Sequence, residues 1–412
     1  MESVLILGRQ AEIGLAELQS LYGNNAVKPL GDHAAVVSVD PCLLAFDRLG
    51  GSMKFAKLLN TLDTTNWNSI IATLAGVAPG HSERMPEGKM RLGLSLYGFN
   101  ETPARIQAGA LQLKKAIKKT GRNVRVIPNQ TADLNTAQVI HNQLTGPNGW
   151  ELLIIKDGSR TVIAQTIKVQ NITAYAKRDQ ERPARDAKVG MLPPKLAQII
   201  INLASGPLPK QQLQNVCDIP AGQPIPRNIM QRTLLDPFCG TGVVLQEALL
   251  MGYDVLGADI DQRMVTYSNK NIDWLRGEHT GLPEANTQVG DATSTTWDAP
   301  VIDLVACETY LGRPFTSTPS PEILNQTVSE CNLIIKKFLQ NAHAQLQPGT
   351  RLCLAVPAWY IDNKPPKRLP LVDQISNLGY NQVEFEQIGH TPLVYRRPDQ
   401  IVARELLVIT RK

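Results

Sequence analysis

The alternation of apolar and polar residues predicts different element patterns in the two halves of the chain. In the first half, apolar segments at Ser3–Leu7 and Met90–Leu96 predict strands. Apolar residues that recur every three or four positions over 106–117 predict a helix with one buried face. Strand-like segments at 151–156 and 161–169 flank Asp157-Gly158, a dipeptide typical of hairpin turns. This half therefore predicts small α/β units.

The second half alternates strand-like and helical segments, which is typical of a parallel, doubly wound sheet. Five strand-like segments carry this pattern: Thr233–Phe238, Asp254–Ile260, Thr287–Val289, Ile302–Cys307 and Arg351–Ala358. The last two segments, Gln382–Gln387 and Glu405–Thr410, have no full helix between them. We therefore expect an α/β fold of the Rossmann type whose sheet ends in an antiparallel pair.

Proline, glycine and charge-rich stretches indicate where the units meet. Asp63–Gly88 reads as mixed and turn-rich, with Pro79-Gly80 marking a loop. Ala176–Lys188 is dense in charge and reads as a linker or exposed loop, and Gly206–Arg227 is rich in Pro, Gly and Gln. We expect four parts: an N-terminal α/β domain at 1–65, a second domain at 66–172, a linker with a helix at 173–230, and a doubly wound domain at 231–412.

Composition narrows the class of protein. The chain has 412 residues, of which 43% are hydrophobic and 19% charged, so it is neither disordered nor a coiled coil. No apolar run approaches the ~20 residues of a membrane-spanning helix, and the N-terminus lacks a secretory signal. The six cysteines lie far apart without a CxxC pair, which predicts no zinc site and no disulfide framework. We expect a soluble, cytoplasmic protein without a metal site.

Charge is distributed unevenly, although the net charge is only +5. Residues 101–200 hold 16 Lys and Arg against 7 Asp and Glu, whereas residues 201–350 hold 9 against 15. A basic middle region favours contact with a polyanion, and an acidic later region favours a cationic or neutral ligand. A solvated basic face explains the same excess equally well.

The clearest local motif is Leu234-Leu235-Asp-Pro-Phe-Cys-Gly-Thr-Gly, where a strand ends at Asp236 and a glycine-containing turn precedes a helix. Gly240 and Gly242 let a ligand approach the backbone at the helix N-terminus. The third glycine of a dinucleotide fingerprint is replaced by Leu245, and Asp236 would repel a pyrophosphate. The motif therefore favours a ligand that carries ammonium, hydroxyl and adenine groups. Cys239 is expected to be a small turn residue rather than a nucleophile.

Further carboxylates follow the next strands. Asp259 ends the second strand, where it can accept from two ribose hydroxyls, and Asp291 ends the third, where it can accept from an adenine amino group. Asp261 competes with Asp259, with a helix N-cap as its alternative role. Each carboxylate alone is more often a cap, but three at successive strand ends favour ligand binding.

Glu308 ends the fourth strand, beside the expected ligand. An exocyclic base nitrogen is a poor nucleophile because its lone pair is delocalised into the ring. A carboxylate and a backbone carbonyl that both accept its N–H bonds would localise and orient that lone pair. The alternative is that Glu308 caps the strand end or pairs with Arg313.

These motifs resemble a known family over nearly the whole chain. DPFCGTG, GADID and VGDA resemble motifs I to III of class I S-adenosylmethionine-dependent methyltransferases, and ETYLG stands where amino-group methyltransferases carry (D/N)PP(Y/F). Upstream, RLGLSLYG, TAQVIHNQL and RPARDAKVGMLPPKLAQIIINLA are similar to THUMP-containing tRNA guanine-N2-methyltransferases, as is the later YRRPDQIVARELLVI. The chain departs from the family at motif IV, where both prolines are missing and Leu311 replaces the aromatic residue.

The resemblance implies methylation of guanine N2 in tRNA, at position ten, with S-adenosylmethionine as cofactor and residues 66–172 as a THUMP domain. The implied catalytic residues are Glu308, Thr309, Tyr310 and Leu311, with the base flipped over Glu308 and Tyr310. The implied cofactor-binding residues are Asp236, Pro237, Phe238, Gly240, Gly242, Asp259, Ile260, Asp291 and Ala292. The expected RNA-binding residues are Lys114, Lys115, Lys118, Lys119, Arg122, Arg125, Arg178, Arg182 and Arg185.

Two alternatives stay open at this point. The first is a methyltransferase that acts on ribosomal RNA or on another nucleic-acid amino group, with DNA disfavoured by the THUMP-like half. The second is a non-catalytic RNA-binding protein whose altered motif IV has lost its chemistry. The sequence does not decide between one and two methyl transfers, or whether a small activating protein partner exists.

Overall fold

The computed structural model describes residues 2–186, 191–299, 301–315, 317–361, 365–398 and 400–412. These residues form two compact units, which are described separately. The first unit comprises the described residues of Met1–Ala11, Asn25–Phe46 and Ser52–Ile172. The second comprises those of Glu12–Asn24, Asp47–Gly51 and Thr173–Lys412. No helix in these described ranges is both long and apolar enough to cross a membrane.

In the first unit, eight strands of the described residues form one sheet in the order β2-β3-β1-β4-β8-β7-β5-β6. Their bounds are β1 Ser3–Leu7, β2 Val27–Leu30, β3 Ala34–Val37, β4 Ser52–Leu62, β5 Met90–Tyr97, β6 Val124–Val126, β7 Gly149–Asp157 and β8 Arg160–Val169. β5 is parallel to β6 and β7, and the other pairs are antiparallel. Strands from both sides of the boundary expected at residue 65 thus share a single sheet.

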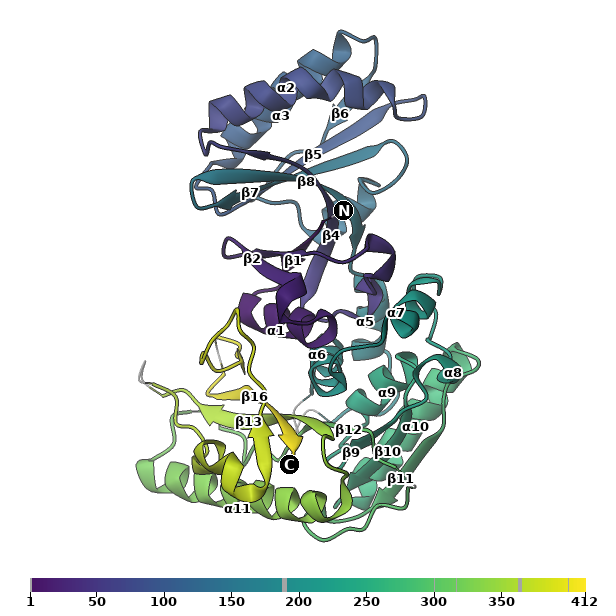
Figure 1. Cartoon of the computed structure of the whole chain (residues 1–412), viewed down its shortest axis with the longest axis vertical. Coiled ribbons are helices and arrows are strands. Elements are labelled where there is room, and N and C mark those ends of the chain that lie inside the picture. Colours follow the sequence, from purple (N-terminus) through teal and green to yellow (C-terminus); the bar gives the residue numbers. More distant parts are fainter. Residues whose placement is uncertain (1, 187–190, 300, 316, 362–364, 399) are drawn as a thin grey trace. The chain divides into compact units, whose positions relative to one another are not determined.

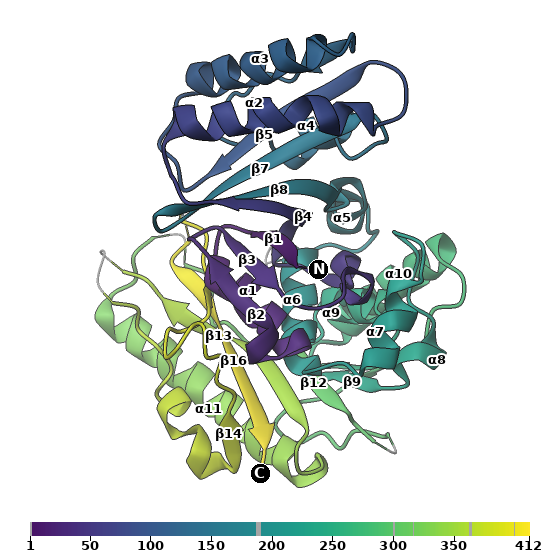
Figure 2. The ribbon, with the colours of Figure 1, turned by 45° about the horizontal axis from the view of Figure 1, so that its top comes forward.

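Two helices, α2 (Trp67–Glu83) and α3 (Pro103–Lys118), cover one face of this sheet at β5 and β7 (Figure 2). Their apolar residues pack against those strands in one buried cluster. A short helix, α4 (Thr136–His141), begins at a capping box made by Asn135 and Gln138. The β7–β8 hairpin is present as predicted, with Asp157 opposite Arg160 and a positive φ at Gly158.

The expectation of a turn-rich stretch at 63–88 is wrong, because α2 occupies most of it. Asn66 caps this helix through the amide of Ser69, and apolar residues on one helix face are buried. Pro79 lies inside the helix, where it removes one hydrogen bond without ending it. Burial of the apolar face outweighs the local cost of Pro79.

The second unit is built on a sheet whose order is β11-β10-β9-β12-β13-β16-β14 (Figure 1). Its strands are β9 Thr233–Asp236, β10 Asp254–Asp259, β11 Ala285–Val289, β12 Leu304–Glu308, β13 Arg351–Trp359, β14 Tyr380–Gln382, β15 Val394–Tyr395 and β16 Val402–Arg411. β9 to β13 are parallel to one another, and β16 runs antiparallel between β13 and β14. The predicted doubly wound sheet with an antiparallel last strand is confirmed, although the strand expected at 382–387 lies at 380–382.

Helices cover both faces of this sheet. The long helix α11 (Pro321–Gln345) buries its apolar side against β12, β13 and β16, and α6 (Pro194–Ser205), α9 (Val243–Leu250) and α10 (Gln262–Glu278) pack near one another and on the sheet. The other helices are α1 Ala11–Tyr22, α5 Ile172–Gln180, α7 Lys210–Cys217, α8 Arg227–Met230, and the 3-10 helices Asn24–Ala26, Pro41–Leu43, Phe46–Arg48 and Pro370–Leu378. The predicted linker at 176–188 is helical up to Gln180, and residues 187 and 188 lie outside the described residues.

Most of α1 belongs to the second unit rather than to the N-terminal domain in which the sequence placed it. Glu17 is fully buried there, and its carboxylate accepts from the amides of Gly50 and Gly51 and from the Asn202 side chain at 2.7–2.9 Å. Arg48 donates to the Asn202 side chain at 2.9 Å. These long-range hydrogen bonds explain why α1 and residues 47–51 fold with the second sheet.

Candidate active site at the carboxyl edge of the second sheet

The turn after β9 is a cradle formed by two glycines with positive φ. Gly240 has φ +50° and Gly242 has φ +79°, a conformation that L side chains rarely adopt. A Cβ on Gly242 would lie 2.3 Å from Ser268 Oγ, whereas a Cβ on Gly240 would meet nothing within 4 Å. Gly242 is also the N-cap of α9. The turn thus packs tightly at Gly242 and is open at Gly240, as a ligand-binding turn requires.

Asp259 is tied to this cradle by the backbone. Its two carboxylate oxygens accept from the amides of Gly240 and Asp261, each at 2.9 Å. Each oxygen keeps a second lone pair that can accept from a hydroxyl. Ile260 follows with 71% of its surface exposed, which leaves an apolar surface beside the carboxylate. The alternative candidate, Asp261, caps α10.

Asp291 has a partner within its own turn. Its Oδ1 accepts from the amide of Thr293 at 2.8 Å, so it acts as the cap of the turn after β11. Ala292 is buried, and its carbonyl accepts from Asn341 at 3.0 Å. The capping role that was the alternative for Asp291 is therefore present, and its other oxygen and the second lone pair of Oδ1 remain for a ligand. Adenine recognition by Asp291 stays a prediction.

Three carboxylates meet at the carboxyl edge of β9, β10 and β12. Burial raises the pKa of Asp236 well above its ordinary value, and the negative charges of Asp259 and Glu308 raise it further. Partial burial also raises the pKa of Asp259. A cationic ligand would relieve this repulsion. Burial likewise raises the pKa of the Cys239 thiol well above its ordinary value, which fits a turn residue that is not a nucleophile.

Glu308, the last residue of β12, is paired with Arg404 of β16 rather than with the sequence candidate Arg313. The Glu308 side chain is 17% exposed and that of Arg404 is 9% exposed. Arg404 belongs to the family-like segment YRRPDQIVARELLVI, but nothing in that segment points to Glu308, which lies almost a hundred residues earlier in the chain. Only the topology, which places β16 next to β13, brings the two side chains together.

The residues after Glu308 form a fixed strand end and an exposed loop. Thr309 is buried, and its amide and hydroxyl both donate to the carbonyl of Ala355, at 3.1 and 3.2 Å. Tyr310 is 42% exposed, and Leu311 is half-buried. Gly312 has φ +83°, and a Cβ there would lie 2.5 Å from the Thr327 side chain. Tyr310 is thus available to a ligand, whereas Leu311 is partly covered.

Some basic residues of the first unit are exposed to solvent, whereas others are already hydrogen-bonded within the protein. Lys115, Lys118 and Lys119 are exposed at the end of α3, and Lys114 is half-buried there. Arg125 is exposed on β6, the edge strand. Arg122 behaves differently. Its guanidinium donates to the carbonyls of residues 82, 85 and 86 and to the side chain of residue 148.

Two arginines of the 173–186 segment are also unsuited to phosphate. Arg178 makes two hydrogen bonds to the buried Glu247 and lies over the Tyr175 ring. Arg182 is buried, with 2% of its surface exposed. Arg185 is exposed, although one of its nitrogens donates to the carbonyl of residue 180. We therefore no longer expect Arg122, Arg178 and Arg182 to contact RNA, because the first two are bonded to other parts of the protein and the third is buried. The sequence could not show this, since the bonding partners are distant along the chain.

Comparison with known proteins gives two kinds of likeness. The chain is 32% identical over 173 residues to the tRNA (guanine(10)-N2)-dimethyltransferase of Methanothermobacter thermautotrophicus, a match that covers 42% of this chain and 40% of that protein. It is 28% identical over 169 residues to the protein of the same name from Pyrococcus abyssi, which covers 40% and 39% of the two chains. No protein-family model matches the chain.

The predicted resemblance to tRNA guanine-N2-methyltransferases is confirmed, whereas the THUMP domain expected at residues 66–172 stays a prediction. The resemblance extends over about two fifths of the length of these curated relatives. The crystal structure of TrmN from Thermus thermophilus matches all of this chain with a TM-score of 0.53 at 14% identity, a likeness of fold. The second unit accordingly has the fold of class I S-adenosylmethionine-dependent methyltransferases. Its antiparallel strand, β16, lies in the sheet between β13 and the edge strand β14.

Proposed function

We propose that this chain transfers a methyl group from S-adenosylmethionine to the exocyclic N2 of a guanosine in tRNA. The observation that carries the proposal is the convergence of Asp236, Asp259 and Glu308 at one edge of the sheet, in a chain similar to two proteins named tRNA (guanine(10)-N2)-dimethyltransferase. The names of these relatives favour position ten as the target.

The residues present fit this cofactor. The open side of Gly240 admits a ligand to the backbone, and the carboxylates of Asp236 and Asp259 suit ammonium and ribose hydroxyl groups. Ile260 and Phe238 offer apolar surface to an adenine ring. When bound, S-adenosylmethionine supplies the methyl group to be transferred. The expected roles of Pro237, Gly242, Asp291 and Ala292 belong to the same proposal.

Glu308 would act on the target base. Its free oxygen and the carbonyl of Thr309 accept the two amino N–H bonds, so that the nitrogen lone pair is directed out of conjugation. Tyr310 offers an exposed ring on which a flipped base can stack. Leu311, partly covered, adds apolar contact. No residue needs to form a covalent bond to the base, and the proton that N2 loses on methylation can pass to the free oxygen of Glu308.

The tRNA would be held by the exposed basic residues of the first unit and by the segment before the catalytic domain. We assign phosphate contacts to Lys114, Lys115, Lys118, Lys119, Arg125 and Arg185. Such contacts position the RNA and carry no sequence information. Guanosine selection therefore belongs to the residues around Glu308.

The test is methyl transfer to defined transcripts. Unmodified tRNA with guanosine at position ten is compared with the same tRNA carrying adenosine there, with a ribosomal RNA fragment and with a DNA duplex. Label confined to the guanosine-ten transcript supports the proposal. Label in ribosomal RNA or DNA alone would overturn the substrate assignment, and cofactor binding without any transfer would favour the RNA-binding alternative. A cytoplasmic location and a small activating protein partner stay predictions.

A further inference from the structure

Arg404 reaches Glu308 across an intervening strand. In register, Glu308 lies beside Ala355 of β13, and Ala355 lies beside Leu406 of β16. Arg404 is two residues from Leu406 and therefore projects from the same face of the sheet. On β13, Ala355 lies beside Glu308 and Pro357 lies opposite Arg404. The Arg404 side chain crosses the face of β13 that carries these two short side chains to reach Glu308.

The neighbouring residue of β16 makes a separate ion pair. Glu405 accepts from Nε and Nη2 of Arg368 in a two-point pair, and adjacent residues of a strand project from opposite faces. In the described part of the chain, the side-chain hydrogen bond of Arg404 is the one from Nε to Glu308 Oε1. The buried guanidinium of Arg404 is therefore dedicated to Glu308.

The pair leaves half of the carboxylate available. Within the described ranges, Oε1 of Glu308 accepts from Arg404, and no hydrogen bond is made to Oε2. A guanidinium only donates hydrogen bonds, so Oε1 of Glu308 serves as the acceptor for Arg404 while Oε2 keeps its own lone pairs for another donor. That is the property needed of a group that orients an amino N–H.

We propose that Arg404 is the positioning residue for Glu308. It fixes one oxygen of the carboxylate so that the other points to the amino group of the target base. This inference rests on the proposed function, because it gives Glu308 the task of orienting that amino group.

The pair also accounts for the altered motif IV. A glutamate has one more rotatable bond than the aspartate of the family motif, and the two prolines that would stiffen the loop are replaced by Thr309 and Tyr310. Thr309 is anchored by its two hydrogen bonds to Ala355. With Arg404 holding the end of Glu308 and Thr309 holding the strand end, the longer side chain is fixed at both ends.

The experiment is a double-mutant cycle of Glu308→Gln and Arg404→Gln, measured by single-turnover methyl transfer to tRNA. Arg404→Lys tests rescue by a shorter cation, and Arg368→Gln is the matched control, because it breaks the neighbouring pair on the same strand. KM for tRNA, affinity for S-adenosylmethionine and the melting temperature are measured for every variant.

We expect Arg404→Gln to lower kcat by at least about 10-fold, with KM and cofactor affinity changed by less than about 2-fold. In the Glu308→Gln background the same change should have no further effect, because its action runs through Glu308. Arg404→Lys should recover part of kcat, and Arg368→Gln should leave kcat near the wild-type value.

Additive losses of kcat in the cycle, or a kcat for Arg404→Lys no higher than for Arg404→Gln, would overturn the assignment. A melting temperature that falls equally in the Arg404→Gln and Arg368→Gln variants, with equal loss of kcat, would show a merely structural role. A wild-type protein that transfers no methyl group would instead refute the proposed function, and the inference with it.

Discussion

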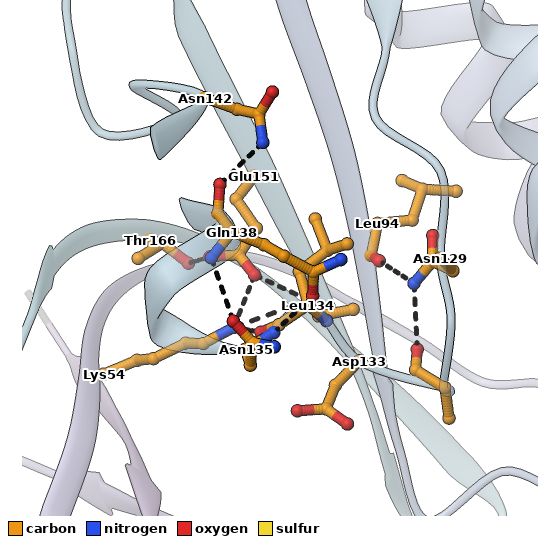
Figure 3. A network of polar contacts seen from close by, with 12 residues as sticks. Lys54, Leu94, Asn129, Asp133, Leu134, Asn135, Gln138, Asn142, Glu151 and Thr166 are labelled. Atoms are coloured by element: carbon orange, nitrogen blue, oxygen red, sulfur yellow. Dashed lines mark hydrogen bonds and ion pairs between the residues drawn. The ribbon is translucent and has the colours of Figure 1, made fainter. Parts of the chain in front are cut away.

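Two carboxylates at strand positions in the two units show how a structural carboxylate differs from the one that we propose acts on the substrate. Glu151 of the first unit is fully buried and bonded on both oxygens, to Lys54 and Ser95 on one and to Thr166 on the other (Figure 3). Glu308 of the second unit is partly exposed, and among the described residues only one of its oxygens has a hydrogen-bond partner. A carboxylate whose oxygens are all satisfied stabilises the fold, whereas one with a free oxygen can bind a ligand.

The largest expected effect is on activity. Glu308→Gln keeps the size of the side chain but weakens its acceptor, so turnover should fall by about 10²–10⁴-fold, the range of a group that assists proton transfer. Affinity for S-adenosylmethionine should stay within about 2-fold. Single-turnover transfer and calorimetry measure the two quantities. Near-normal turnover would show that Glu308 takes no part in methyl transfer, and Glu308 and Glu151 would then not differ in function.

For the buried Lys54–Glu151 pair of the first unit we expect a loss of stability rather than a direct effect on the chemistry. Lys54→Met leaves the Glu151 carboxylate buried without its cation, which costs about 3–5 kcal/mol of stability. Hydrogen exchange of the β7 and β8 amides reports the loss in this unit. The double variant Lys54→Met, Glu151→Leu serves as the control, because removing both charges should restore most of the protection. Wild-type protection in Lys54→Met would contradict the structural assignment.

A third carboxylate, Glu17, extends the comparison because it should make the stability of the second unit depend on pH. Burial raises its pKa from 4.5 to about 7, and hydrogen bonds from Asn202, Gly51 and Gly50 oppose this rise. Because the folded-state pKa is the higher one, its contribution is complete below pH 4.5 and is lost as the pH rises toward about 7. We expect the stability of the second unit to fall across this window by a few kcal/mol.

Glu17→Gln is the control for this prediction, since glutamine does not titrate. Denaturant unfolding at pH 5, 6 and 7, followed by a probe in the second unit, should show a flatter pH dependence in the variant. An equal slope in both proteins would assign the pH dependence to other groups. Activity per folded molecule should be unaffected, as for any structural carboxylate.

The smallest effect is expected at the exposed basic residues. Replacing Lys118 and Lys119 by glutamine should weaken tRNA binding and lower the slope of log K against log salt by about 1 for each lost phosphate contact. Lys336 and Lys337, an exposed pair on α11, provide the matched control. An unchanged slope in the first variant would return the α3 lysines to the solvated-face interpretation.

The sequence predicted much of the second unit because the signals there are local. Strand ends at Asp236, Asp259 and Glu308 follow from apolar runs that stop at a carboxylate, and parallel strands bring such ends to one edge. The order of the sheet and the antiparallel β16 confirm this pattern. These features depend on a few neighbouring residues and can be derived without knowing the tertiary contacts.

The predictions from sequence fail where contacts with distant residues determine the local structure or the partner of a side chain. Pro79-Gly80 suggested a loop, yet the buried face of α2 overrides it, although the cap at Asn66 and the periodicity from Ile70 to Ala78 could have indicated a helix. Arg122 and Arg178 looked free because their partners lie tens of residues away. Arg404 was missed for the same reason, since nothing near it in the sequence points to Glu308.

The central claim is best tested by nucleoside analysis of tRNA after incubation with the wild-type chain and S-adenosylmethionine, with Glu308→Gln run in parallel. The account predicts N2-methylated guanosine at position ten from the wild type and at most a trace from the variant. Equal amounts of N2-methylated guanosine from both proteins would contradict the role of Glu308. Methylation of another nucleoside would contradict the assignment of the substrate.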